Sequence, residues 1–259
     1  MNPRQPQLRT ALVLALVSIF ATALLFPYLL ALQPAALELA SAASGLPVAV
    51  IIAAQSLQAG VILFLLAWAG LKLGAPLGLG APWLSAWLYR QPVPVAPTWT
   101  QAALLGALAG GLVLVAIALF GAPIEESTPT AQATLAFAAK GLLASPYGAV
   151  VEEVSMRAFV MGGLAWLLSR LCGGQPRAWV MIAAIVIAAL AFGAGHLPMA
   201  AQLAPLTLGV VTRVIVYNTL PGLIFGWLYW KRGLEHAMLA HFCADLVLHV
   251  VAPLASLGA

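Results

Sequence analysis

Residues 146–169 read PYGAVVEEVSMRAFVMGGLAWLLS, a stretch that is long and apolar enough to cross a bilayer as one helix. It nevertheless contains three ionisable side chains, Glu152, Glu153 and Arg157. Such a side chain at bilayer depth costs about 2.5–3.5 kcal/mol and usually marks a functional site. The stretch therefore predicts a membrane-spanning fold with a functional site inside it.

The composition extends this prediction to the whole chain. Of its 259 residues, 63% are hydrophobic and 7% are charged, whereas soluble domains carry about 25% charged residues. We predict an all-α polytopic membrane protein with seven transmembrane helices, at residues 10–32, 47–71, 100–121, 146–169, 178–196, 206–230 and 234–254. Residues 131–145 are too short to cross alone. They lie on the surface, extend the fourth span, or form an eighth helix.

The distribution of positive charge predicts the orientation. Eight of the eleven lysines and arginines fall on one side of the seven-span arrangement: Arg4, Arg9, Lys72, Arg90, Arg170, Arg177, Lys231 and Arg232. The opposite loops carry only acidic residues, namely Glu38, Glu125 and Glu126. This positive-inside pattern predicts a cytoplasmic N-terminus in a multi-pass cell-membrane protein, most simply of a bacterial inner membrane. Because topology accounts for the net charge of +4, we expect no nucleic-acid partner.

The chain divides into two parts at a proline-rich segment. Residues 74–98 are predicted to be the longest loop, with Trp83, Trp87 and Tyr89 suited to the membrane interface. Residues 1–98 are therefore expected to form an N-terminal pair of spans with this loop, and residues 99–259 to form a helix bundle.

Three groups of polar residues lie within the bundle, and the first is in the opening stretch. Ser145 and Pro146 resemble a helix N-cap followed by proline at the first helical position. Glu153 and Arg157 are four residues apart, which predicts an ion pair on one helix face. Glu152 has no partner in its own segment, so it is our candidate for a general base.

The second and third groups lie on later spans. FGAGH, residues 192–196, ends the fifth span in two glycines and His196. HAMLAHFCADLVLH, residues 236–249, places His241 and Asp245 on one helix face, which His249 continues. Asp245 is expected either to orient the His241 imidazole or to share a proton path with it. His236 is predicted to be near water at the helix start.

The order and spacing of these groups resemble a known family. Glu152-Glu153-x-x-x-Arg157, Phe192-x-x-x-His196 and His241-x-x-x-Asp245 are similar to the motifs of the CAAX-protease and bacteriocin-processing family of intramembrane proteases. The resemblance covers roughly residues 135–250. It implies a glutamate-dependent endopeptidase that cleaves a membrane-tethered protein or peptide.

The resemblance also implies roles for individual residues. Glu152, helped by His196, would activate a water, while His241 and Asp245 would stabilise the oxyanion. Glu153, Arg157 and Phe192 would support the site. An ionised Asp245 can only accept hydrogen bonds, so it would have to be protonated to donate to an oxyanion, or would instead orient His241.

Several alternatives to this reading stay open at the level of sequence. A zinc ion held by Glu152 and the two histidines is the competing mechanism, although the expectation from the family is chemistry without a cofactor. A non-catalytic immunity or scaffold protein and a transporter or proton relay are the competing functions. The predicted spans place the site toward the outer surface, which suits a substrate segment of an exported protein, such as a C-terminal sorting signal.

Overall fold

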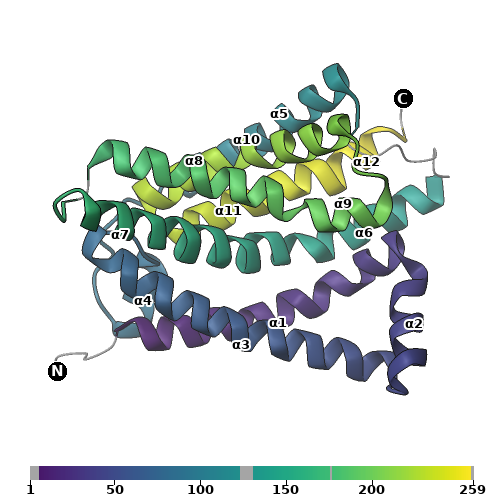
Figure 1. The fold of residues 1–259 in the computed structure, drawn as a ribbon, viewed down its shortest axis with the longest axis horizontal. Coiled ribbons are helices and arrows are strands. Elements are labelled where there is room, and N and C mark those ends of the chain that lie inside the picture. The colour runs from purple at the N-terminus through teal and green to yellow at the C-terminus, as the bar shows by residue number, and fades with distance from the viewer. Residues whose placement is uncertain (1–5, 123–130, 176, 258–259) are drawn as a thin grey trace.

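The computed structural model describes residues 6–122, 131–175 and 177–257. These residues form helices and short connections, with no strand among them (Figure 1). Seven helices are long and apolar enough to cross a membrane, at Gln7–Leu32, Val48–Leu77, Trp99–Phe120, Gln132–Leu171, Ala178–Leu203, Leu208–Arg232 and Leu234–Ala255. The predicted all-α polytopic fold is confirmed, and the chain is a multi-pass membrane protein.

The N-terminal part is a hairpin that leans against the bundle. It consists of α1 (Pro6–Leu32), α2 (Pro34–Ser44) and α3 (Val48–Gly74). The long helices α1 and α3 pack on each other and diverge toward α2, which bridges their far ends (Figure 1). A small cluster of Phe26, Leu37 and Ile51 joins the three helices there. The hairpin contacts the bundle through α1 against α6 and through α3 against η3.

The connection between hairpin and bundle is more structured than predicted. It contains the 3₁₀ turn η1 (Ala75–Leu77) and the helix α4 (Pro82–Tyr89). The Leu84 amide donates to Oε1 of Glu235 at 2.7 Å, so an acidic side chain of α11 satisfies a free amide in the first turn of α4. Trp87 is 73% exposed, which agrees with its expected place at the membrane interface.

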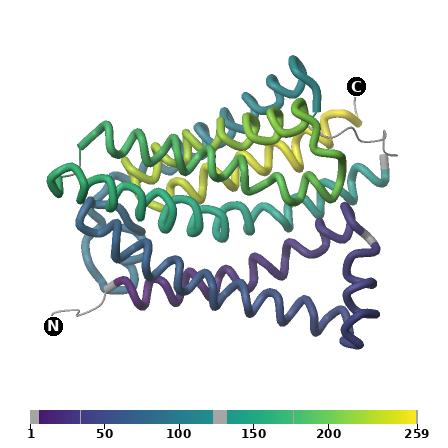
Figure 2. Tube along the Cα trace, in the orientation of Figure 1, coloured from purple at the N-terminus to yellow at the C-terminus, as the bar shows by residue number. Residues whose placement is uncertain are grey.

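The bundle is built around α11. Its elements are α5 (Trp99–Phe120), α6 (Ala131–Tyr147), the π-helical segments η2 (Gly148–Glu152) and η3 (Val154–Met161), α7 (Gly162–Leu171), α8 (Ala178–Gly195), α9 (Leu197–Leu203), α10 (Leu208–Arg232), α11 (Leu234–Leu246), the π-helical η4 (Val247–Val251) and α12 (Ala252–Ala255). Helix α11 packs against α5, α6, α10 and η2, and the Cα trace shows it running between α10 and the fourth span (Figure 2).

Small residues allow the helices around α11 to approach it closely. Gly106 and Gly110 of α5 lie against the backbone of Ala240 and Ala244, where a side-chain carbon would meet carbonyl oxygens. Such small-residue contacts are the usual way that membrane helices pack, because lipid offers little hydrophobic drive for association. The second half of α11, which carries His241 and Asp245, is therefore held firmly.

The fourth span corrects one prediction and decides another. Residues 131–145 extend it, so that Gln132–Leu171 form one continuous crossing. The N-cap prediction at Ser145 and Pro146 is wrong, because Pro146 lies inside α6 and the Ser145 hydroxyl donates backward to the Gly141 carbonyl at 2.9 Å. Glu152 consequently lies deep within a long span rather than in the second turn of a helix.

The connections separate to two ends of the molecule. The start of α1, α4 and the α7–α8 connection lie at one end, while α2, α9 and α12 lie at the other (Figure 1). The predicted basic side corresponds to the first of these ends, although Arg4, Glu125 and Glu126 lie outside the described residues. Which end faces the cytoplasm stays a prediction.

Candidate active site

The deepest part of the site is a buried ion pair. Nε of Arg157 lies 3.2 Å from Oε2 of Glu153, and the two side chains are 1% and 0% exposed. Both come from the widened helix of the fourth span, Arg157 from η3 and Glu153 from the junction of η2 with η3. The pair predicted from their spacing is therefore present. It leaves neither charge alone in a low-dielectric interior, where an unpaired charge is costly.

Glu153 also holds an imidazole. Its Oε1 lies 2.8 Å from Nδ1 of His241. Because a carboxylate only accepts, the hydrogen of this bond is on the His241 ring. The second oxygen of Glu153 faces Arg157, so one carboxylate joins the arginine to the histidine across two spans. The sequence offered Asp245 either as the residue that orients His241 or as its partner in a proton path; the shorter of the two contacts is the bond that His241 donates to Glu153.

The other edge of the His241 ring faces two carboxylates. Nε2 lies 3.6 Å from Oε2 of Glu152 and 3.6 Å from Oδ1 of Asp245. The side chains of Glu152 and Asp245 are 25% and 16% exposed, against 6% for His241. The network thus has a sealed half, made by Glu153 and Arg157, and a half that remains accessible.

Two phenylalanine rings enclose the network. Phe225 of α10 stacks on the His241 ring with centroids 4.7 Å apart, and Phe192 of α8 meets the same ring edge-on at 5.7 Å. Cζ of Arg157 lies 5.0 Å from the Phe192 centroid and 5.6 Å from the Phe225 centroid. The two rings thus make cation–π contacts with the Arg157 guanidinium. Its terminal nitrogens have no hydrogen-bond acceptor among the described residues. Phe225 was not predicted from the sequence.

His196 approaches the site through Phe192. Its ring stands edge-on to Phe192 at 4.8 Å, and Nδ1 donates to the Phe192 carbonyl at 2.9 Å. In a neutral ring this leaves the lone pair on Nε2. Within the described part of the chain, no ion pair joins His196 to Glu152. The structure therefore places His196 beside the network, with a single phenylalanine between the two imidazoles.

A glycine makes room for the accessible half. Gly148 precedes Glu152 by one helical turn, and a side-chain carbon there would lie 2.6 Å from Oδ2 of Asp245 and 2.8 Å from Nε2 of His241. These separations are too short for any side chain. Gly148 is thus a second site residue that the sequence analysis missed, and its spacing to Glu152 was the available signal.

Three other ionisable residues of the spans, His249, His236 and Arg213, lie outside the network around His241. His249 is against Tyr28 of α1, with Nδ1 3.4 Å from the hydroxyl, and not in the network. His236, predicted to be near water, is fully buried and stacks on Trp99 at 4.2 Å, because α4 and α5 cover the start of α11. Nη1 of Arg213 donates to the Phe120 carbonyl at 3.2 Å, where it caps α5.

The part of the chain that contains the network is similar to a known protein family. Residues 134–247 match the model of a family described as type II CAAX prenyl endopeptidase Rce1-like. This part of the chain is similar to the CAAX-protease family. The resemblance read from the three motifs is confirmed. No curated protein and no solved structure matches the chain.

The matched region fits the geometry of the site. It begins in α6, ends at the first residue of η4 and contains every residue of the network together with Phe192, Phe225 and His196. The hairpin α1–α3 and helix α5 lie outside it. Because that family consists of proteases, the match supports a hydrolytic activity in general.

Within residues 6–122, 131–175 and 177–257, no three His, Cys, Asp or Glu side chains are grouped so that they could hold a metal ion. The carboxylates of Glu152, Glu153 and Asp245 lie around the two nitrogens of the His241 imidazole.

Proposed function

We propose that the chain is a glutamate-dependent intramembrane endopeptidase, with Glu152 as the base that activates water. The observation that carries the proposal is the two-sided environment of His241. One ring nitrogen is bound by the sealed Glu153–Arg157 pair, and the other faces two accessible carboxylates. A buried, oriented imidazole beside an accessible carboxylate is a common arrangement for acid–base chemistry.

The reaction follows from these positions. A water attacks the scissile carbonyl carbon while Glu152 accepts its proton, and the carbonyl oxygen becomes an oxyanion. His241, protonated on Nε2, donates to that oxyanion, a contribution of about 3–4 kcal/mol in other hydrolases. Glu152 then returns its proton to the leaving nitrogen as the carbon–nitrogen bond breaks. The free Nε2 of His196 accepts from the attacking water or from the substrate amide.

Asp245 is assigned to stabilising the protonated His241 ring and not to donating a hydrogen bond to the oxyanion. It faces the same nitrogen as Glu152 at the same distance. When ionised it only accepts, so it would stabilise the protonated form of His241 that the oxyanion requires. Glu152, His241 and Asp245 would then share protons as a coupled group.

We further propose that the substrate is a membrane-tethered segment of an exported protein. His196 follows the end of α8 nearest α2 and α12, opposite to the basic end of the molecule (Figure 1). By the positive-inside rule that end faces outward, in a bacterium toward the periplasm or cell exterior. Cysteine labelling of residues 196–204 from outside intact cells tests this. Labelling only after the cells are opened would contradict an outward site.

The activity is tested with a pair of glutamine variants. Strains that lack the gene are complemented with wild type, Glu152→Gln or Glu38→Gln, and the C-termini of membrane and secreted proteins are mapped. Glu38 is an exposed residue of α2, so its variant controls for the substitution itself. We expect unprocessed termini only with Glu152→Gln, since loss of a general base costs about 10²–10⁴-fold. Normal processing by Glu152→Gln would refute the enzyme and favour an immunity or scaffold role.

A further inference from the structure

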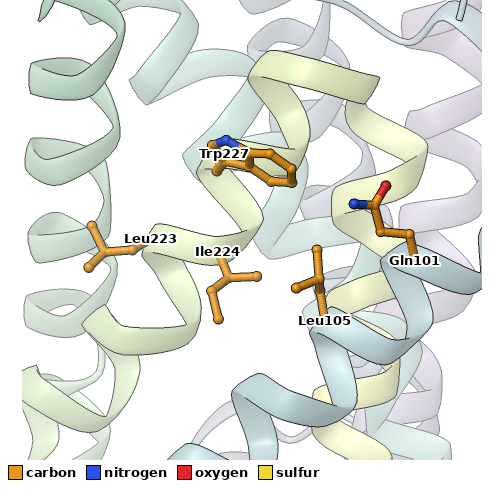
Figure 3. Close-up of a pocket in the computed structure, with 5 residues that line it drawn as sticks. All are labelled: Gln101, Leu105, Leu223, Ile224 and Trp227. Carbon is orange, nitrogen blue, oxygen red and sulfur yellow. The ribbon is translucent and has the colours of Figure 1, made fainter. Parts of the chain in front are cut away.

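An apolar groove lies on the outer face of the bundle, away from the network. It has a volume of about 380 Å³ and is lined by Gln101 and Leu105 of α5 and by Leu223, Ile224 and Trp227 of α10. Figure 3 shows Gln101 and Leu105 facing Ile224 and Trp227 across the seam between the two helices. The groove is therefore open to the hydrocarbon of the membrane along one side.

The groove changes from polar to apolar along its length. Gln101 is the third residue of α5 and Trp227 is near the end of α10, so the amide and the indole lie at the same end of the antiparallel pair. Leu105 and Ile224 lie about one turn deeper. The amide and the indole thus lie at the depth of the membrane interface, and the aliphatic side chains lie deeper. This arrangement fits an amphiphilic molecule whose polar headgroup is at the membrane surface.

Positive charge lies just beyond the polar end. Lys231 and Arg232 end α10, and Lys231 follows Ile224 by seven residues, so the two lie on nearly the same helix face. The Lys231 ammonium lies 3.4 Å from the Trp230 centroid. Lys231 and Arg232 thus follow Trp227 by four and five residues on α10. They carry two positive charges beyond the polar end of the groove, and neither is within 4 Å of a carboxylate among the described residues.

We propose that the groove binds one anionic phospholipid, with an acyl chain between α5 and α10 and the phosphate at Lys231 and Arg232. The charge argues for an anionic over a neutral headgroup. Basic pockets between membrane helices are known to bind such headgroups. This proposal does not depend on the protease activity.

The position of the groove suggests what the lipid supports. Ile224, in its floor, is adjacent in sequence to Phe225, which is buried and stacks on His241. The lipid would fill the outer side of α10 at the level where the inner side carries that ring. It would thus act as a structural ligand on the outer side of α10, behind the wall of the candidate active site.

The test measures lipid binding by native mass spectrometry of the full chain. The probes are phosphatidylglycerol and phosphatidylcholine with identical acyl chains. We expect one phosphatidylglycerol to bind about 25-fold tighter than phosphatidylcholine, about fivefold for each basic residue. The double variant Lys231→Gln/Arg232→Gln should abolish this preference. Its control, Lys72→Gln/Arg170→Gln, removes two charges from the same end of the molecule on other helices and should leave the preference unchanged.

A second pair of variants tests the acyl chain. Gln101→Trp and Ile224→Trp fill the groove from its two walls, and each should weaken phosphatidylglycerol binding about tenfold or more because the buried methylenes are lost. Leu104→Trp is the control, since Leu104 is 65% exposed on α5 and does not line the groove. Equal binding of the two lipids would overturn the proposal. Wild-type binding by both filled variants, or equal loss in either control, would also overturn it.

Discussion

Replacement of Gly148 by alanine should inactivate the site while the fold remains. The new methyl group would lie 2.6 Å from Oδ2 of Asp245 and 2.8 Å from Nε2 of His241, whereas ordinary contact begins at 3.4 Å. The two atoms must therefore move by about 0.6–0.8 Å. Both are at the ends of side chains, so these side chains can move without a shift of the backbone. The displaced atoms are the ones to which we assign the chemistry.

The two expected effects differ in size. A misplacement of 1 Å can cost about 10²-fold in rate, so we expect activity to fall roughly 20–100-fold. Overpacking costs about 1–3 kcal/mol of stability, and alanine in place of glycine within a helix offsets about 1 kcal/mol of that. The net destabilisation should thus be about 0–2 kcal/mol. A large loss of rate with a small loss of stability separates displacement of the site from unfolding.

The assay is cleavage of a substrate segment, found by the C-terminal mapping, in proteoliposomes, with thermal unfolding of the same preparations. Gly111→Ala is the matched control, because Gly111 of α5 has no neighbouring atom within 4 Å of an added carbon. It should keep full activity and gain slightly in stability. If Gly148→Ala cleaves within threefold of wild type, the accessible half of the network is not where the reaction occurs.

Three further perturbations address other parts of the site. Arg157→Met leaves Glu153 buried without its cation and should destabilise the protein by about 3–5 kcal/mol in thermal unfolding, whereas a change under 1 kcal/mol would mean that the pair is unimportant for folding. Phe225→Leu removes the ring stacked on His241 and should lower kcat about tenfold with little change in KM; an effect on KM alone would place Phe225 in substrate binding. Treatment with a zinc chelator should leave cleavage unchanged, and a loss of activity that added zinc restores would refute a reaction without metal.

The sequence predicts the spans well because the bilayer constrains them strongly. A membrane helix must satisfy its backbone within itself and must be about twenty residues long. The predicted bounds of the spans therefore lie close to the observed ones, except around Ser145 and Pro146. A serine before a proline can cap a helix, but it can equally donate to the carbonyl four residues earlier, as Ser145 does to Gly141. Local sequence does not distinguish these two uses.

Within the site, contacts along one helix are predictable from the sequence, whereas contacts between helices are not. The Glu153–Arg157 contact follows from a spacing of four residues along one helix, so the sequence predicts it. The Glu153–His241 bond joins residues 88 positions apart and depends on how α11 packs against the fourth span. Phe225 is one of several aromatic residues in α10, and only its position opposite His241 distinguishes it. Residues that act across helices require the packing, which the hydropathy pattern does not contain.

The sealed half of the network accounts for how a histidine can be held at this depth. Alone, a buried carboxylate or arginine would be too costly, but Glu153 and Arg157 form a pair without net charge that still offers one acceptor oxygen. That oxygen fixes the His241 ring through Nδ1. A proton on Nε2 of this ring then lies between Glu152 and Asp245, while Phe192 and Phe225 contact the ring edge-on and face-on. A chain with so few charges has thus gathered five ionisable residues in one network, in which Glu153 and Arg157 hold the imidazole and Glu152, His241 and Asp245 can share a proton. The accessible edge of Glu152 is where water can reach this group.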